Sequence, residues 1–286
     1  CLRMCLRKMS IDFNRNRAQV SFERFIGVTS PNDLLAKKDD FKNHSLTAAE
    51  VQQLDSDLQC DAIDFFYNGI LSFSEGIDSI FQKRFSWATV KLYYSIYYLI
   101  RASLAVRGFA LVRCGNICRL KNAVGEKTVG TNNRKYKSTH EGTMNHYKDI
   151  FSMADRLLSN KIEDYDAYQW MMNAREIMNY RSVSFLEPNC LDIWEFFSTC
   201  VDNGTLATEL KNLEDDNYIK CFQEEFAVVA IPIMRMKETI ADMASGGLLA
   251  RLTHDREAFA KTVLNYDHRS LYILSDIFRR GVEEHN

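Results

Sequence analysis

Proline and glycine are scarce in this chain, with three prolines and twelve glycines among 286 residues. These two residue types form most tight turns, so a fold of many short strands has little support. Apolar residues make up 46% and charged residues 26% of the chain, which is ordinary for a globular protein and unlike a disordered one. We therefore expect a folded protein of the all-α class, built from long helices.

The chain also lacks a strong net charge and a long hydrophobic run. A net charge of −2 gives it no overall attraction for nucleic acid or anionic lipid, so binding of either would need a local basic patch. The longest apolar run, Leu92 to Ile100, is about half of the ~20 residues that a membrane span requires. The first residues contain no apolar segment suited to export. We expect a cytoplasmic protein that makes no membrane contact.

Cysteine and histidine patterns do not predict a metal site. Eight cysteines are too few for a disulfide scaffold, and most are unevenly spaced, as small buried hydrophobes are in a reducing compartment. Cys1/Cys5 and Cys114/Cys118 are spaced more widely than zinc knuckles and have no histidines nearby. His254 and His268 lack a third ligand at helical spacing, and no metalloprotease or paired-carboxylate motif is present. We expect neither a metal nor another cofactor.

The first hundred residues predict two long helices after a short N-terminal segment. Apolar residues between 18 and 28 suggest a strand or hairpin. A capping-box pattern from Thr47 to Glu50 then begins a helical stripe of about 35 residues. Ser86 is the expected N-cap of the next helix, and Gly108 its C-terminal glycine. That second helix is apolar on nearly every face, so we expect it at the centre of a bundle.

Residues 113 to 146 differ from the rest, because glycine and asparagine recur and basic residues outnumber acidic ones. This composition predicts a long basic loop, in which Arg134, Lys135 and Lys137 are candidate RNA contacts. The alternative is a solvated linker, since no ladder of aromatic residues is interleaved with the basic ones.

Helical periodicity returns in the second half of the chain. It covers residues 146–158 and 164–181, continues from Leu191 to Val201, and predicts three further helices after Leu206. We divide the chain into an N-terminal segment (1–45), a helical bundle (46–202) and a C-terminal helical extension (203–286).

Two segments carry a family resemblance. The first, SWATVKLYYSIYYLIRASLAVRGF from Ser86, is an aromatic helix that leads to a small-residue turn and a glycine. The second, AREIMNYRSVSF around Arg175, has an Arg-centred polar motif. In this order, and with a variable loop between them, they resemble the second long helix and the late helix of the HEPN family over roughly residues 47–202. That family consists of helical bundles common in prokaryotic toxin–antitoxin and antiviral systems.

The resemblance implies RNA as the ligand, and a homodimer or a complex with a partner protein. In HEPN ribonucleases an arginine precedes a histidine by four to six residues, which implies metal-independent cleavage: histidine moves protons while arginine holds the phosphate. Here no histidine follows Arg175 at that spacing. Four candidate catalytic residues therefore lie on the late helix: Arg175, Asn179, Tyr180 and Arg181. The fifth is His140 of the basic loop, because it follows Arg134 at the spacing found in the family.

Three functions stay open. The first is an HEPN-like component of a prokaryotic antiviral-defence or toxin–antitoxin system that binds RNA or acts as a degenerate ribonuclease. The second is a non-catalytic helical module that binds a partner protein such as an ATPase or nucleotidyltransferase. The third, a metal-dependent hydrolase, has no supporting motif. For the single residues, Arg175 could instead pair with an acid and fix helix packing, and the tyrosines from Tyr93 to Tyr98 could belong to the core or stack on a ligand.

Overall fold

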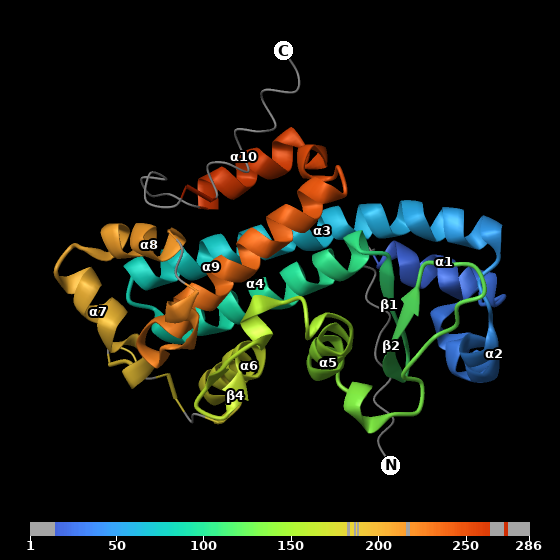
Figure 1. Ribbon diagram of the computed structural model, residues 1–286, viewed down its shortest axis with the longest axis horizontal. Coiled ribbons are helices and arrows are strands. Elements are labelled where there is room, and N and C mark those ends of the chain that lie inside the picture. The colour runs from blue at the N-terminus through green and yellow to red at the C-terminus, as the bar shows by residue number, and fades with distance from the viewer. Residues whose placement is uncertain are drawn as a thin grey trace.

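The computed structural model describes residues 15–181, 184–185, 187, 189–215, 218–263 and 272–273. Over these residues the chain forms a helical bundle with two small antiparallel sheets, which confirms the predicted all-α class (Figure 1). The helices are α1 (Arg17–Phe25), α2 (Lys38–Asn43), α3 (Ala48–Phe81), α4 (Phe85–Val106), α5 (Thr139–Phe151), α6 (Ala167–Glu176), α7 (Glu195–Asp202), α8 (Leu206–Glu214), α9 (Glu224–Ser245) and α10 (His254–Val263). The strands are β1 (Phe109–Cys114), β2 (Asn116–Lys121), β3 (Lys161–Ile162) and β4 (Tyr165–Asp166).

Helices α3 and α4 pack against each other in antiparallel order at the centre of the bundle. The predicted capping box starts α3, because Thr47 accepts the backbone N–H of Glu50 and the Glu50 carboxylate accepts that of Thr47. Gly69 and Gly76 do not break this helix. They let α4 approach closely: an added Cβ would lie 2.7 Å from the Leu99 side chain at Gly69 and 2.8 Å from Leu92 at Gly76.

Helix α4 is central, as its apolar pattern predicts, and most of its residues are buried. Its start differs from the prediction: Arg84 is the N-cap, and Ser86 lies inside the first turn, where its N–H and hydroxyl donate to Glu187. Helix α9 lies along α4 and also contacts α3 (Figure 1). Residues of α9 belong to the same hydrophobic core, and the predicted division after residue 202 stays a prediction.

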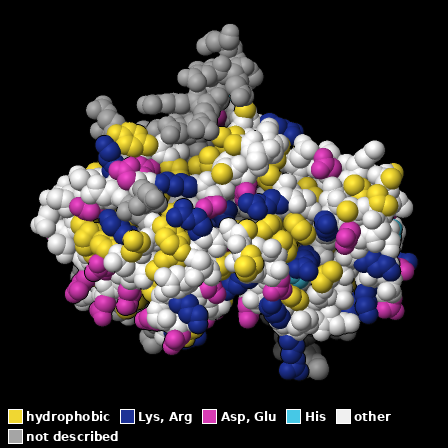
Figure 2. Space-filling model, viewed as in Figure 1, with side chains coloured by type: hydrophobic (Ala, Val, Ile, Leu, Met, Phe, Trp, Pro, Cys, Tyr) yellow, Lys and Arg dark blue, Asp and Glu magenta, His cyan; other side chains and the backbone are white. Residues whose placement is uncertain are grey.

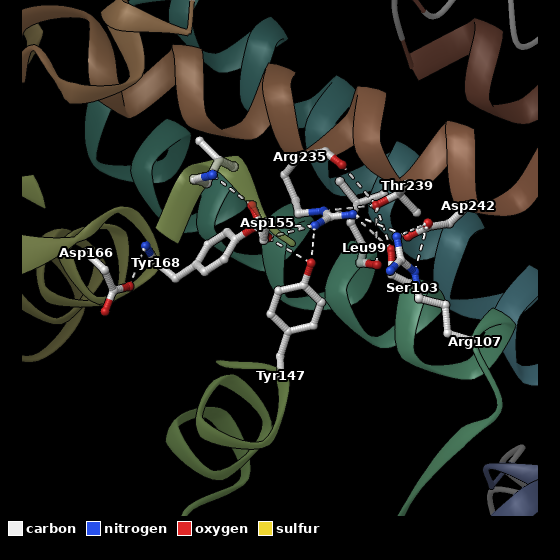
Figure 3. Close-up of polar contacts among 11 residues, drawn as sticks. Leu99, Ser103, Arg107, Tyr147, Asp155, Asp166, Tyr168, Arg235, Thr239 and Asp242 are labelled. Carbon is white, nitrogen blue, oxygen red and sulfur yellow. Dashed lines mark hydrogen bonds and ion pairs between the residues drawn. The ribbon is translucent and has the colours of Figure 1, made fainter. Parts of the chain in front are cut away.

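A buried polar network joins α4, α5, α6 and α9 around Arg235 (Figure 3). The Arg235 side chain is 1% exposed. Its Nη1 donates to the hydroxyl of Tyr147 at 2.5 Å and to Asp155 Oδ2 at 3.2 Å, and its Nη2 donates to Ser103 Oγ at 3.0 Å. The Tyr168 hydroxyl also donates to Asp155. Because a buried cation is tolerated only with such partners, this network fixes the four helices relative to one another.

Two further local predictions are wrong. The segment between residues 18 and 28 forms helix α1 rather than a strand, because Asp61 of α3 accepts the N–H groups of Arg17 and Ala18 and so caps its first turn. The segment from 113 to 146 is not one long loop. It contains most of the β1–β2 hairpin, which turns at Gly115 with φ +78°, and the first half of α5.

Helix α5 therefore begins at Thr139, earlier than the predicted start at His146. The helices predicted over 164–181, from Leu191 and after Leu206 are present, with a turn of π-helix from Ile177 to Arg181 at the end of α6. No helix in the described ranges combines the length and the apolar character needed to cross a membrane.

Candidate functional site

Tyr93 lies where α4, α5 and α6 meet, and two of the predicted site residues contact it. Its hydroxyl is 3.1 Å from Nδ1 of His140, in the first turn of α5. The guanidinium carbon of Arg175, from α6, lies 4.8 Å from the centre of its ring. His140 and Arg175 are 35 residues apart in sequence (175 − 140), yet the helix packing brings both to one tyrosine. We call Tyr93, His140 and Arg175 the Tyr93 cluster.

Local sequence fixes the position of His140. Ser138 is the N-cap of α5 and accepts the backbone N–H of Glu141, so His140 occupies the first helical turn. Gly142 lies against the backbone of Tyr136, where an added Cβ would be 2.9 Å from its carbonyl oxygen. The short 3-10 turn from Arg134 to Tyr136 is thus held against the start of α5.

The environment keeps His140 neutral. Burial, together with the positive charges of Arg175 and Arg101, lowers the pKa of His140 to about 4. Burial also raises the pKa of Tyr93 well above its ordinary value, although a hydrogen bond from Arg175 opposes this rise. At neutral pH the cluster therefore consists of a neutral imidazole, a protonated phenol and one guanidinium cation.

Hydrogen bonding selects the tautomer of His140. The buried Tyr93 hydroxyl has one proton to donate, and Arg175 offers only donors, so we assign Nδ1 of His140, 3.1 Å away, as the acceptor of that proton. A neutral imidazole that accepts at Nδ1 carries its own proton on Nε2. Among the described residues none hydrogen bonds to Nε2. The half-buried ring can therefore offer an N–H donor to a ligand, rather than a basic nitrogen.

Aromatic rings surround His140. The ring centres of Tyr97 and Tyr94 lie 4.5 and 5.4 Å from that of His140. Tyr93 and Tyr97 are buried, as expected of core residues, whereas Tyr94 and Tyr98 are only half-buried. The buried tyrosines of α4 therefore belong to the core, and the half-buried ones line the site.

Arg175 is 5% exposed and lies over Tyr93, so it reaches a ligand poorly but acts on His140 through its charge. The remaining late-helix candidates lie in the π-helical turn, where α-helical spacing no longer holds. Asn179 is half-buried. Arg181 is exposed and pairs with Glu176 at 3.3 Å. Of Tyr180 the structure describes the backbone but not the side chain. A role for these three residues stays a prediction.

The predicted RNA contacts lie beside the start of α5. Arg134 and Lys137 are exposed, and no carboxylate in the described part of the chain pairs with either. Lys135 is less available, because its ammonium lies 2.5 Å from Asp149. The exposed Arg113, at the end of β1, donates to Thr139 Oγ1 at 2.8 Å and so lies next to His140. We call Arg113, Arg134 and Lys137 the basic rim.

Within the described ranges no group of three or more His, Cys, Asp and Glu side chains is placed to hold a metal ion. Cys1, Cys5 and His268 lie outside those ranges. In comparisons with known proteins, no family model, curated protein or solved structure matches the chain. The site is therefore interpreted from its own geometry. That geometry adds Tyr93, Arg101 and Arg113 to the sequence candidates, since their roles depend on contacts between helices.

Proposed function

We propose that this chain is an HEPN-like RNA-binding component of a prokaryotic antiviral-defence or toxin–antitoxin system, with the Tyr93 cluster and the basic rim as its RNA site. The observation that supports this proposal most directly is the meeting of His140 and Arg175 at Tyr93, next to exposed cations that pair with no carboxylate among the described residues. Guanidinium and ammonium groups bind phosphate, and an imidazole N–H donates to phosphate oxygens.

The same geometry favours binding over cleavage. A general base for the ribose hydroxyl needs a free basic nitrogen, but Nδ1 of His140 accepts from Tyr93 and Nε2 carries the proton. The arginine that would hold the phosphate is buried. We therefore propose a degenerate site, which holds RNA and cuts it slowly or not at all.

The test measures binding of the full chain to a fluorescein-labelled single-stranded RNA by anisotropy over a range of salt concentrations. Neutralising the basic rim with Arg134→Gln and Lys137→Gln should weaken binding. It should also lower the slope of log K against log salt by about 1.4, since each lost phosphate contact on a single strand contributes about 0.7. A matched control, Lys161→Gln with Arg251→Gln, removes two exposed cations from other parts of the structure and should leave the slope unchanged.

Equal losses in both double variants would show non-specific attraction and would contradict the proposed site. The same RNA, incubated with excess protein and EDTA, should remain intact. Rapid cleavage that is lost in His140→Ala would show that the site is an active nuclease and would overturn the degenerate assignment.

A second candidate function, binding of a partner protein, is supported by an acidic cleft at the α7 end of the molecule, lined in part by α6 and by the start of α9. Two adjoining hollows of about 690 and 380 Å³ share Ile193 and Glu224. Asp and Glu side chains gather over this end, near α7 (Figure 2). The lining residues that suit a basic, partly apolar segment of a partner are Asp192, Glu195, Phe196, Glu224 and Glu225.

This candidate is tested with a labelled peptide of alternating arginine and leucine. Glu224→Gln with Glu225→Gln should weaken its binding, whereas Glu209→Gln with Glu257→Gln, which changes carboxylates outside the cleft, should not. Equal binding by both variants would remove the cleft as a protein-binding site.

A further inference from the structure

Beside His140, one face of α4 carries a stripe of side chains with features that the hydrophobic core does not require. Tyr94, Tyr98 and Arg101 follow one another at spacings of four and three residues, which places them on one face of the helix. All three are half-buried, whereas their neighbours Tyr93 and Tyr97 are buried. The ring centres of Tyr94 and Tyr98 are 6.2 Å apart, with the planes inclined by 31°. The stripe therefore offers two aromatic rings followed by a cation.

Arg101 is a cation held in place without an ion pair to any of the described residues. Its guanidinium carbon lies 4.0 Å from the ring centre of Phe65 and 5.6 Å from that of Tyr97. Arg101 Nη1 donates a long hydrogen bond of 3.4 Å to the Tyr97 hydroxyl. The buried Nε of Arg101 has no hydrogen-bond partner among the described residues. Burying part of a guanidinium costs free energy unless a counter-charge is supplied, so Arg101 is suited to receive an anion.

The nearest acid does not supply that charge. Asp61 acts on Arg101 electrostatically, but its carboxylate accepts the backbone N–H groups of Arg17 and Ala18 and lies 3.9 Å from the Arg17 guanidinium. The cavity between Arg101 and Asp61 measures only about 10 Å³, which is too small for a phosphate. An anion must therefore approach Arg101 from the outer side, where Tyr98 lies one turn away.

We propose that the stripe Tyr94–Tyr98–Arg101 binds an unpaired stretch of RNA, with bases stacked on the two tyrosines and a backbone phosphate on Arg101. This inference rests on the proposed function and specifies its ligand as single-stranded. Aromatic rings stack on any exposed base, and an arginine beside them takes the phosphate, as in other single-strand sites. In a duplex the base faces are already stacked on one another, so the tyrosines have nothing to bind.

The experiment compares Tyr98→Leu with wild-type protein on a labelled 12-nucleotide single-stranded RNA and on the same strand annealed to its complement. Loss of the ring should weaken binding of the single strand by on the order of 10-fold and leave duplex binding unchanged. Tyr98→Phe keeps the ring and should bind as the wild type does. Tyr67→Leu is the matched control, because Tyr67 is also half-buried and lies beneath an arginine, Arg256, at 4.9 Å.

Arg101 is tested by salt dependence. Arg101→Gln should weaken single-strand binding and lower the salt slope by about 0.7, while Arg101→Lys should keep the slope. Circular dichroism of each variant distinguishes loss of binding from loss of folding.

If wild-type protein binds no RNA, the proposed function fails and this inference fails with it. If RNA binds and depends on the basic rim, but Tyr98→Leu and Arg101→Gln bind as the wild type does, the stripe alone is overturned.

Discussion

At the residue scale, His140 and Arg175 both contact Tyr93, His140 through its Nδ1 and Arg175 through its guanidinium. Arg175 and His140 stand out because arginine and histidine have the right chemistry for RNA, but the sequence pairs His140 with Arg134 rather than with Arg175. The pairing that the structure shows passes through Tyr93, whose pattern on α4 is that of any core residue. The tautomer and the pKa of His140 depend on burial and on charges from other helices, which cannot be predicted from the spacing of residues in the sequence.

The charge of Arg175 should be measurable at His140. Arg175→Gln removes the cation that lowers the pKa of His140 most, so this pKa should rise from about 4 toward its ordinary value, although burial continues to hold it down. The measurement is a histidine titration by NMR. Arg175→Lys keeps the charge and should leave the pKa low, and an unchanged pKa in Arg175→Gln would contradict the electrostatic role given to Arg175.

Elements with strong start signals and clean periodicity were predicted well, whereas those that depend on tertiary partners were not. The capping box and the apolar stripe define α3 within the sequence itself. Helix α1 is short, and its N-terminal cap is Asp61 from a distant part of the chain. The spacing of its apolar residues alone therefore fits a strand as well as a helix. The β1–β2 hairpin has mixed apolar and basic residues, and its Gly115 and Asn116 resemble residues of a loop.

The close contact between α3 and α4 gives a prediction for Gly76. Gly76→Ala places a methyl group 2.8 Å from the Leu92 side chain, so we expect destabilisation of about 1–3 kcal/mol despite the higher helix propensity of alanine. Urea unfolding measures the loss. Combining Gly76→Ala with Leu92→Ala should give less than the sum of the single losses, because the second change removes the clashing atoms. Additive losses would contradict direct contact.

At the scale of the whole molecule, the helices are joined by buried polar groups as well as by the core. The positive charge of Arg235 compensates the negative charge of Asp155, and its Nη2 lies 3.6 Å from Asp242 Oδ2. The sequence shows only an arginine in an apolar helix, and its partners come from three other parts of the chain. The all-α class was predictable from composition and periodicity, but this network was not.

Arg235→Met should therefore be strongly destabilising, by about 3–5 kcal/mol, because it leaves the buried Asp155 carboxylate without its cation. Thermal or urea unfolding measures the effect. Arg251→Met, at an exposed arginine, is the control and should change stability by less than about 0.5 kcal/mol. Similar effects at both positions would contradict the structural role of the network.

Acid should weaken the fold through His146. Burial lowers its pKa to about 4, and Nε2 donates to the Ile117 carbonyl at 2.9 Å. Since the unfolded chain takes up a proton below about pH 6.5 and the folded chain does not, the stability present above that pH is lost as pH falls toward 4. The loss is up to roughly 3 kcal/mol. In His146→Gln the urea midpoint should fall less between pH 7 and 5 than in wild type, and equal falls would contradict this assignment.

The most direct test of the proposed RNA site is a nitrogen-15 NMR spectrum of the histidine side chains, recorded with and without single-stranded RNA. Because Nδ1 of His140 accepts from Tyr93, free protein at pH 7 should show His140 neutral with its proton on Nε2. Saturable addition of RNA should shift Nε2 of His140 while leaving the distant His254 unchanged. A His140 signal that does not move at saturating RNA would contradict the account.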